Sequence, residues 1–131
     1  MKNQLSLIFV GFIVLVGCTK QPTFTISGTL TNAADKTIYL EHTALLGTTL
    51  VDSCHIDTDG NYSLEAPAPS YPDFYRLRVG SRSLPLAIDS TEHVQVSTSL
   101  DSLPYTLNIN GSDVSVQMAQ LRATARTATR E

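Results

Sequence analysis

The residue whose surroundings most clearly predict a chemical modification is Cys18. It directly follows Leu15-Val16-Gly17, at the end of an apolar run that begins at Leu5 and contains no charged side chain. A small residue before a cysteine at this place is typical of a lipobox, in which the thiol is acylated before the leader is cleaved off. We therefore expect Cys18 to be lipidated. The alternative is an ordinary secretory leader in which Cys18 is incidental.

Residues 1–17 have the layout of a signal peptide. Lys2 supplies the positive head, and the apolar stretch that follows is too short to cross a bilayer unaided. Two or more acyl chains hold a protein stably on a membrane, so residues 18–23 would form a lipidated tether. Because Thr19 is not the acidic residue that retains lipoproteins at the inner membrane, we expect the periplasmic face of the outer membrane.

Cys54 is the second thiol of the chain, and it would be the only free one if Cys18 is acylated. The sequence contains no C-x-x-C motif, so no thiol redox centre is expected. His55 is adjacent, but neighbours in a strand point to opposite faces. Cys54 is therefore either a small buried apolar residue without reactivity or a thiol that forms a mixed disulfide with a partner.

Arg76 and Arg78 are the basic residues whose spacing predicts a binding surface. They are two positions apart in a predicted strand, so both side chains lie on one face of it. Such a pair could bind anionic groups of a protein, a glycan or a lipid. The alternative is an ordinary strand face in contact with solvent.

Residues 57–61 (Asp-Thr-Asp-Gly-Asn) raise the question of a calcium loop. If Gly60 takes the obligatory glycine position, His55 and Ala66 fall where calcium needs oxygen ligands. An Asp-Gly turn between two strands explains these residues instead. No metal or cofactor is predicted, and the dispersed histidines are assigned to strand positions facing solvent: His42, His55 and His93.

Several classes of function are disfavoured by composition and motifs. The chain has no nucleophile elbow, no glycine-rich phosphate loop and no carboxylate pair suited to acid–base chemistry. We therefore expect a non-catalytic protein. From Cys18 onward the net charge is 8 − 12 = −4, since Lys2 belongs to the leader, and a mildly acidic chain does not favour nucleic acid as a partner.

The elements that must position these residues are mostly strands. Apolar and polar side chains alternate over residues 24–110, and turn residues recur between the alternating segments. This pattern predicts an antiparallel β-sandwich of about eight short strands. The expected strands are residues 24–30, 37–41, 48–56, 62–65, 74–79, 83–88, 93–97 and 105–109.

Residues 111–131 follow a helical period instead. The segment Gly111-Ser112-Asp113 offers a capping residue, and apolar residues recur at spacings of three and four. These are Val114, Met118, Leu121 and Ala125. Arg122, Arg126 and Arg130 form a basic stripe on another face. Because no stop signal precedes Glu131, we interpret the helix as a connector.

The order of these motifs resembles that of a known domain. The relevant segments are the Cys18 lipobox, Phe24-Thr-Ile-Ser-Gly28, Asp59-Gly-Asn-Tyr-Ser63, Pro72-x-Phe-Tyr75 and Asn110-Gly-Ser112. This arrangement is similar to the all-β domain of unknown function, of the DUF4369 type, at the N-terminus of lipid-anchored thioredoxin-like proteins of the TlpA/ResA type. The similarity extends over residues 24–125.

The resemblance implies a sandwich-like domain that spaces or docks a partner domain near a membrane. In such proteins a helix leads into a thioredoxin fold that carries C-x-x-C, and this chain contains no such motif. Two hypotheses follow. The chain is the N-terminal positioning module of a thioredoxin-like redox protein, or it is a complete lipoprotein that binds a protein or glycan.

Overall fold

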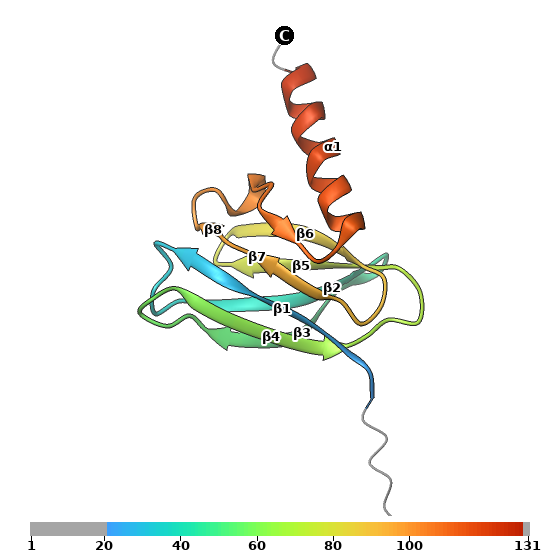
Figure 1. The fold of residues 1–131 in the computed structure, drawn as a ribbon, viewed down its shortest axis with the longest axis horizontal. Coiled ribbons are helices and arrows are strands. Elements are labelled where there is room, and N and C mark those ends of the chain that lie inside the picture. The colour runs from blue at the N-terminus through green and yellow to red at the C-terminus, as the bar shows by residue number, and fades with distance from the viewer. Residues whose placement is uncertain (1–20, 130–131) are drawn as a thin grey trace, which may run out of the picture.

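The computed structural model describes residues 21–129, and the predicted leader and Cys18 lie outside this range. Two β-sheets pack face to face, and a single long helix rises from them (Figure 1). The prediction of a mainly β sandwich with a C-terminal helix is confirmed.

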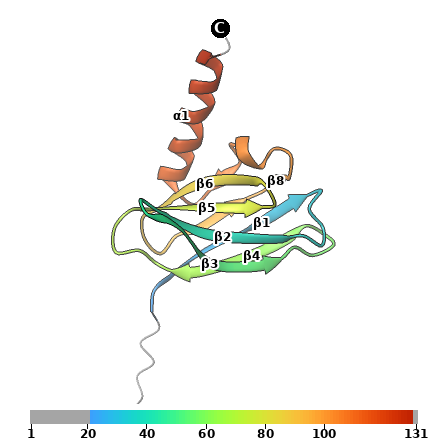
Figure 2. The same ribbon diagram turned by 180° about the vertical axis from the view of Figure 1, so that it is seen from behind.

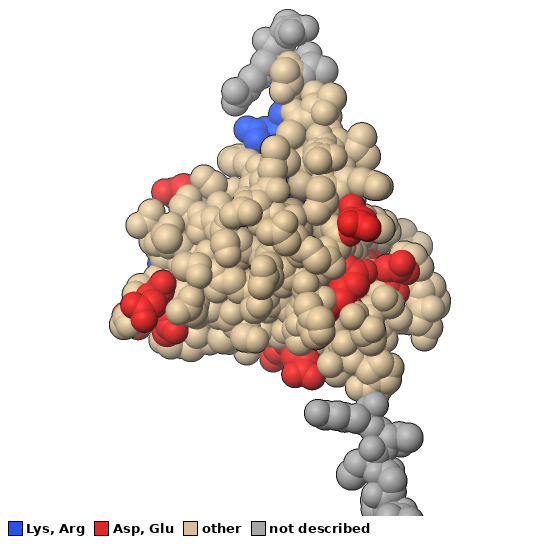
Figure 3. All heavy atoms as spheres, in the orientation of Figure 1, with Lys and Arg blue, Asp and Glu red and all other residues tan. Residues whose placement is uncertain are grey.

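The first sheet has the strand order β4-β1-β7-β9 and is of mixed type. Its strands are β1 (Thr23–Thr31), β4 (Asn61–Pro67), β7 (His93–Val96) and β9 (Ile109–Asn110), while β8 (Thr98–Ser99) pairs with the end of β1. β1 is antiparallel to β4 but parallel to β7 and β8, so the expectation of purely antiparallel strands was wrong here. The centre of its outer face shows little charge (Figure 3), because its strands present serine, threonine and glutamine side chains.

The second sheet has the strand order β3-β2-β5-β6, and its strand pairs are antiparallel. It consists of β2 (Thr37–Ala44), β3 (Gly47–His55), β5 (Asp73–Val79) and β6 (Arg82–Ile88). This sheet faces the viewer in Figure 2. Pro85 lies in β6, which is an edge strand of this sheet, where a missing amide donor is tolerated.

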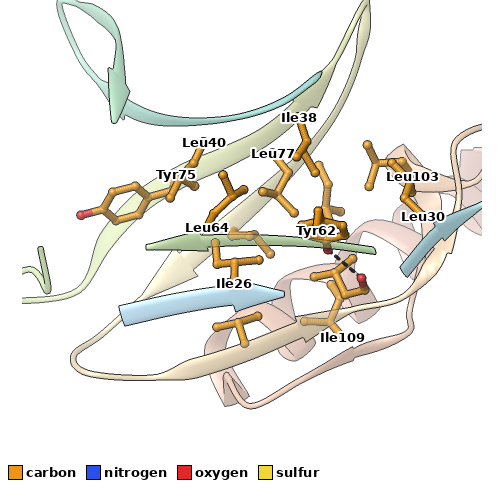
Figure 4. Packing of buried hydrophobic residues seen from close by; sticks show 14 of the residues in the cluster. Ile26, Leu30, Ile38, Leu40, Tyr62, Leu64, Tyr75, Leu77, Leu103 and Ile109 are labelled. Atoms are coloured by element: carbon orange, nitrogen blue, oxygen red, sulfur yellow. Dashed lines mark hydrogen bonds between the residues drawn. The ribbon is translucent and has the colours of Figure 1, made fainter. Parts of the chain in front are cut away.

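One apolar core fills the space between the sheets. Inward positions of the strands alternate with exposed ones, most regularly in β4. Phe24 from the first sheet and Tyr75 from the second meet edge to face, with ring centroids 4.9 Å apart. The Tyr62 hydroxyl donates a hydrogen bond of 2.6 Å to the Val96 carbonyl, which satisfies a polar group inside the core (Figure 4).

The turn at residues 57–61 joins β3 to β4, as predicted. The carboxylate of Asp57 accepts hydrogen bonds from the backbone amides of Asp59 and Asn61, both at 2.9 Å. Gly60 has a φ of 87°, and a Cβ there would come within 2.7 Å of the Leu30 carbonyl oxygen. Turn geometry therefore accounts for the acidic residues of this segment.

The strand predicted at residues 105–109 was wrong. A 3-10 helix, η1 (Leu103–Tyr105), occupies its start, and only the short β9 forms at its end. Pro104 lies in the first turn of η1, where its missing amide is harmless and its fixed φ suits a helix. Leu103 fills the core beneath it.

The helix α1 (Asp113–Thr129) follows β9 after a sharp turn at Gly111. Gly111 has a φ of 88°, and a Cβ there would lie 1.9 Å from the His93 carbonyl oxygen. Only glycine fits this approach of backbone to backbone. The helix therefore begins directly against the sandwich and then projects away from it (Figures 1 and 2).

Candidate functional site

Arg76 and Arg78 lie on the outer face of the second sheet, as their spacing predicted, and both bind Glu41. Arg76 Nη2 donates to Glu41 Oε2 at 3.0 Å, and Arg78 Nε donates to Glu41 Oε1. Glu41 lies on the neighbouring strand β2, paired with Arg76. Its side chain is only 10% exposed, whereas the two arginine side chains are about one-third exposed.

The electrostatics of this cluster stabilise the ionised carboxylate. Burial by itself would raise the pKa of Glu41, but the hydrogen bonds and positive charges of Arg76 and Arg78 outweigh it, so the pKa lies below its ordinary value. The arginines are thus partly neutralised within the domain. Sequence reasoning identified both arginines but missed Glu41, because only the sheet pairing brings it to them.

A shallow groove of about 540 Å³ adjoins this cluster at one end of the second sheet. Arg78 stacks over the ring of Tyr39, with its guanidinium carbon 4.5 Å from the ring centroid. Arg82 lines the same groove and pairs with Asp101 at 3.2 Å. Lys36 completes its basic lining. A groove lined by cations and a tyrosine ring is suited to anionic or glycan groups.

A second groove, of about 430 Å³, lies at the other end of the same sheet. His42 Nε2 and Asp73 Oδ2 are 2.7 Å apart within it, and both side chains are about 30% exposed. Burial would raise the pKa of Asp73, but the bond to His42 and the Phe74 amide lower it below its ordinary value. The pair links β2 to β5. No signal in the sequence predicted it, since 31 residues separate its members.

The same groove holds Tyr75, whose ring lies 5.1 Å from that of His42. Burial, and then the nearby charge of Asp73, raise the pKa of the Tyr75 hydroxyl. The contacts with Asp73 and Tyr75 can orient the imidazole of His42. These contacts therefore fix the orientation of the side chains that line this part of the groove.

The structure places the other two histidines apart from this pair. His55 Nε2 is 3.5 Å from Asp35, and His93 Nδ1 is 2.7 Å from the Thr25 hydroxyl. Over residues 21–129, no group of three histidine, cysteine or acidic side chains comes together in a way that could hold a metal ion.

Cys54 is half-buried in β3, so it is not the fully buried residue of the first sequence-based alternative. It packs against the core from the edge of the second sheet, and its thiol lies 3.3 Å from the His55 carbonyl oxygen. β3 is an edge strand, and this explains the residual exposure. Within the described part of the chain Cys54 is a free cysteine.

The base of α1 is attached to the edge strand β6 through two serines. Ser112 caps the helix, accepting a hydrogen bond of 3.3 Å from the Ser115 amide and donating one of 3.0 Å to the Ala87 carbonyl. The fully buried Ser115 hydroxyl accepts from the Ala87 amide at 3.0 Å and donates to its carbonyl at 2.8 Å. These bonds hold the start of the helix on one residue of the sheet.

The face of α1 that contacts the sandwich differs from the predicted apolar stripe. Val114 and Leu121 are 39% and 70% exposed, whereas Ser115 and Ala119 are buried. Two arginines of the predicted basic stripe contact the η1 segment of the sandwich instead. Arg122 donates to the Pro104 carbonyl, and Arg126 lies 3.9 Å above the ring centroid of Tyr105. Arg130 lies outside the described residues.

The predicted lipidation site cannot be placed, because Cys18 also lies outside the described residues. The first described strand begins five residues later, at Thr23. In the described region, no helix combines the length and apolar character needed to span a membrane.

These features define a two-sheet β-domain whose edge strand carries a projecting helix. The comparison with known families then assigns it. The model of the domain of unknown function DUF4369 matches residues 24–118, and the chain belongs to this family. The expected resemblance to this type of domain is thereby confirmed.

Other comparisons give no functional information. No curated protein matches the chain. Among solved structures, the crystal structure of (S)-allantoin synthase is similar with a TM-score of 0.39 and 15% sequence identity. That match covers 68% of this chain and 42% of the other, so the chain corresponds to less than half of that protein.

Proposed function

We propose that this chain is a lipid-anchored, non-catalytic domain that positions a thioredoxin-like domain at a bacterial envelope membrane. The observation that carries the proposal is the attached base of α1. A helix held at Ala87 by both Ser112 and Ser115 leaves the sandwich in one direction. This is the property required of a connector that places whatever follows it.

The two routes by which the chain enters and leaves the sandwich support the same role. β1 begins on the lower side in Figure 1, whereas α1 rises from the upper side. With 17 residues, α1 extends for about 25 Å. The chain therefore enters the sandwich and leaves it in different directions, which would keep a C-terminal neighbour apart from an N-terminal anchor.

Replacing the acylated residue tests the anchor. In cells that make the protein with its own leader, Cys18→Ala should move it from the membrane fraction to the soluble fraction, since no acyl chain can then be attached. Cys54→Ala is the matched control and should stay in the membrane fraction. An unchanged distribution of the Cys18 variant would contradict the lipoprotein proposal.

The reading frame downstream of the Glu131 codon tests the positioning role. A continuing thioredoxin-like segment with C-x-x-C, in frame or one frameshift away, would support it. A stop codon together with an intact mass equal to that of lipidated residues 18–131 would contradict it and favour the second candidate.

The second candidate is a lipoprotein that binds a protein or glycan by itself. The groove of about 540 Å³ lined by Lys36, Tyr39, Arg78 and Arg82 favours it. Acidic oligosaccharides are the chemical class that this lining would bind, through charge and ring stacking. Calorimetric titration of the protein with such oligosaccharides distinguishes the two candidates, because a positioning module should give no heat of binding.

A further inference from the structure

Four segments meet at the end of the sandwich where the described chain begins. β1 starts there, and Thr23 pairs with Pro67 at the end of β4. The antiparallel pairing of β2, β3, β5 and β6 brings three connections to the same end: the β2–β3 turn at 45–46, the β4–β5 loop at 68–72 and the β6–β7 loop at 89–92. They lie together on the right in Figure 1 and on the left in Figure 2. We name these four segments the tether end.

The β2–β3 turn consists of two leucines with fully exposed side chains. Leu45 and Leu46 have relative exposures of 105% and 102%, the highest among the exposed large apolar residues of the described chain. Two-residue hairpin turns favour asparagine, aspartate and glycine, which supply turn geometry and polarity. Two leucines contribute neither, and they make no contribution to the core. Their presence points to an apolar environment outside the domain.

Aromatic side chains extend this apolar surface. Tyr71, in the β4–β5 loop, is 70% exposed, and Phe74, at the start of β5, is 56% exposed. Tyrosine is favoured at membrane–water interfaces, because its ring is apolar and its hydroxyl is polar. Two exposed leucines and an exposed tyrosine at the same end of the domain therefore have the composition of a shallow membrane contact.

The charges of the tether end identify the kind of lipid surface. The three connections contain no lysine or arginine, and the β6–β7 loop carries Asp89 and Glu92. Attraction to anionic headgroups would require basic residues. Contact with a bilayer would therefore depend on apolar insertion and would be insensitive to the content of anionic lipid.

The tether limits how far this end can be from an acylated Cys18. Pro22 is fixed to the β4–β5 loop, since its carbonyl accepts a hydrogen bond of 2.9 Å from the Ala68 amide. Cys18 is four residues before Pro22, and four residues span at most about 14 Å. The acyl chains would thus enter the bilayer beside the tether end.

We propose that the Leu45–Leu46 turn inserts into the headgroup region of the bilayer and docks the tether end on it. The inference rests on the proposed lipidation of Cys18, which supplies the attachment, whereas the leucines supply the orientation. The occupant is a lipid surface, because the acyl tether brings lipid to within reach of these side chains.

Site-directed fluorescence on the acylated full-length protein tests the inference. In a Cys54→Ser background, an environment-sensitive dye is placed at Ser70→Cys on the tether end or at Ser81→Cys on the β5–β6 turn at the opposite end. Both serines are exposed. In phosphatidylcholine vesicles that contain headgroup-region spin-labelled lipid, the dye at position 70 should be quenched and the dye at position 81 should not. Replacing one-third of the phosphatidylcholine by phosphatidylglycerol should not increase the quenching.

Leu45→Ser combined with Leu46→Ser removes the proposed contact without touching the core. In this double variant, the ratio of docked to undocked protein should fall roughly tenfold or more, as measured by quenching of the dye at position 70. Burying even one leucine side chain favours partition into the bilayer by about that factor. The acylated protein should still sediment with the vesicles.

The outcomes separate the two proposals. If acylated protein is attached but position 70 is as unquenched as position 81, or if the leucine variant changes nothing, docking is overturned and anchoring stands. Quenching that appears only with anionic lipid, or a leucine-dependent dimer in place of quenching, also overturns docking. If mass spectrometry finds Cys18 without acyl chains, the anchor itself has failed, and the docking inference fails with it.

Discussion

At the scale of single residues, Glu41 on β2 binds two arginine side chains of the neighbouring strand β5. Its carboxylate is nearly buried and binds Arg76 and Arg78 on the adjacent strand. Alternation within one strand predicted that the two arginines share a face. It did not predict their partner, because cross-strand register depends on pairing between segments 35 and 37 residues apart.

Glu41→Gln should destabilise the domain by about 1 to 3 kcal/mol at pH 7, since it leaves two partly buried guanidinium groups without their counter-charge. Urea unfolding curves measure this difference. Glu65→Gln is the control, because Glu65 is exposed on β4 and should change stability little. Equal losses of unfolding free energy in the two variants would contradict a stabilising role of the cluster of Glu41, Arg76 and Arg78.

The difference in stability between the wild type and Glu41→Gln should depend on pH in a defined way. The pKa of Glu41 is lower in the folded chain than its ordinary value of 4.5. Its charge therefore contributes stability above the unfolded-state pKa, and this contribution is lost as the pH falls through the lower folded-state value. The stability difference between the wild type and Glu41→Gln should be constant from pH 7 to about 5 and shrink at lower pH.

At the scale of elements, α1 shows which features of a helix can be predicted from the periodicity of the sequence and which cannot. Spacing predicted the helix, which is confirmed, and the segment 111–113 expected to supply its cap contains Ser112, which does cap it. Spacing also predicted one apolar stripe, but two of its residues, Val114 and Leu121, are exposed. The contact face is chosen by Ser115, whose hydroxyl binds both backbone groups of Ala87, and by arginines that reach η1. Hydrophobicity alone does not reveal an interface in which hydrogen bonds accompany small buried side chains such as Ala119.

Ser115→Ala should loosen the base of the helix. The substitution removes the hydroxyl that pairs with the Ala87 amide and carbonyl, at a cost of about 1 to 3 kcal/mol for buried groups left unpaired. Amide hydrogen exchange should accelerate in α1 more than in β1. Thr124→Ala, on an exposed helix position, is the control and should leave both rates unchanged. Unaltered exchange in Ser115→Ala would contradict the attached-base description.

At the scale of the whole molecule, the two sheets share one apolar core. Phe24 is completely buried and meets Tyr75 across the interface between the sheets. The sequence predicted the two-sheet class because alternation marks one apolar face per strand. It did not predict the parallel pairing of β1 with β7, because either direction of a strand buries the same face.

Phe24→Ala should reduce the free energy of unfolding by about 3 to 5 kcal/mol, because a large core side chain is replaced by a cavity. Phe74→Ala, on the exposed side of β5, should cost far less. Amides in both sheets should lose protection equally in Phe24→Ala when exchange is measured by mass spectrometry. Loss in the first sheet alone would mean that the sheets unfold separately.

The attachment of α1 to Ala87 also has a mechanical consequence. Ala87 lies on β6, paired with Phe74 of β5, so the helix is attached to the outermost strand of a sheet. If that strand tilted by about 5°, the far end of a helix of about 25 Å would move by about 2 Å. A small tilt of one strand would thus become a displacement large enough to open or close a contact, and the helix would act as a lever arm.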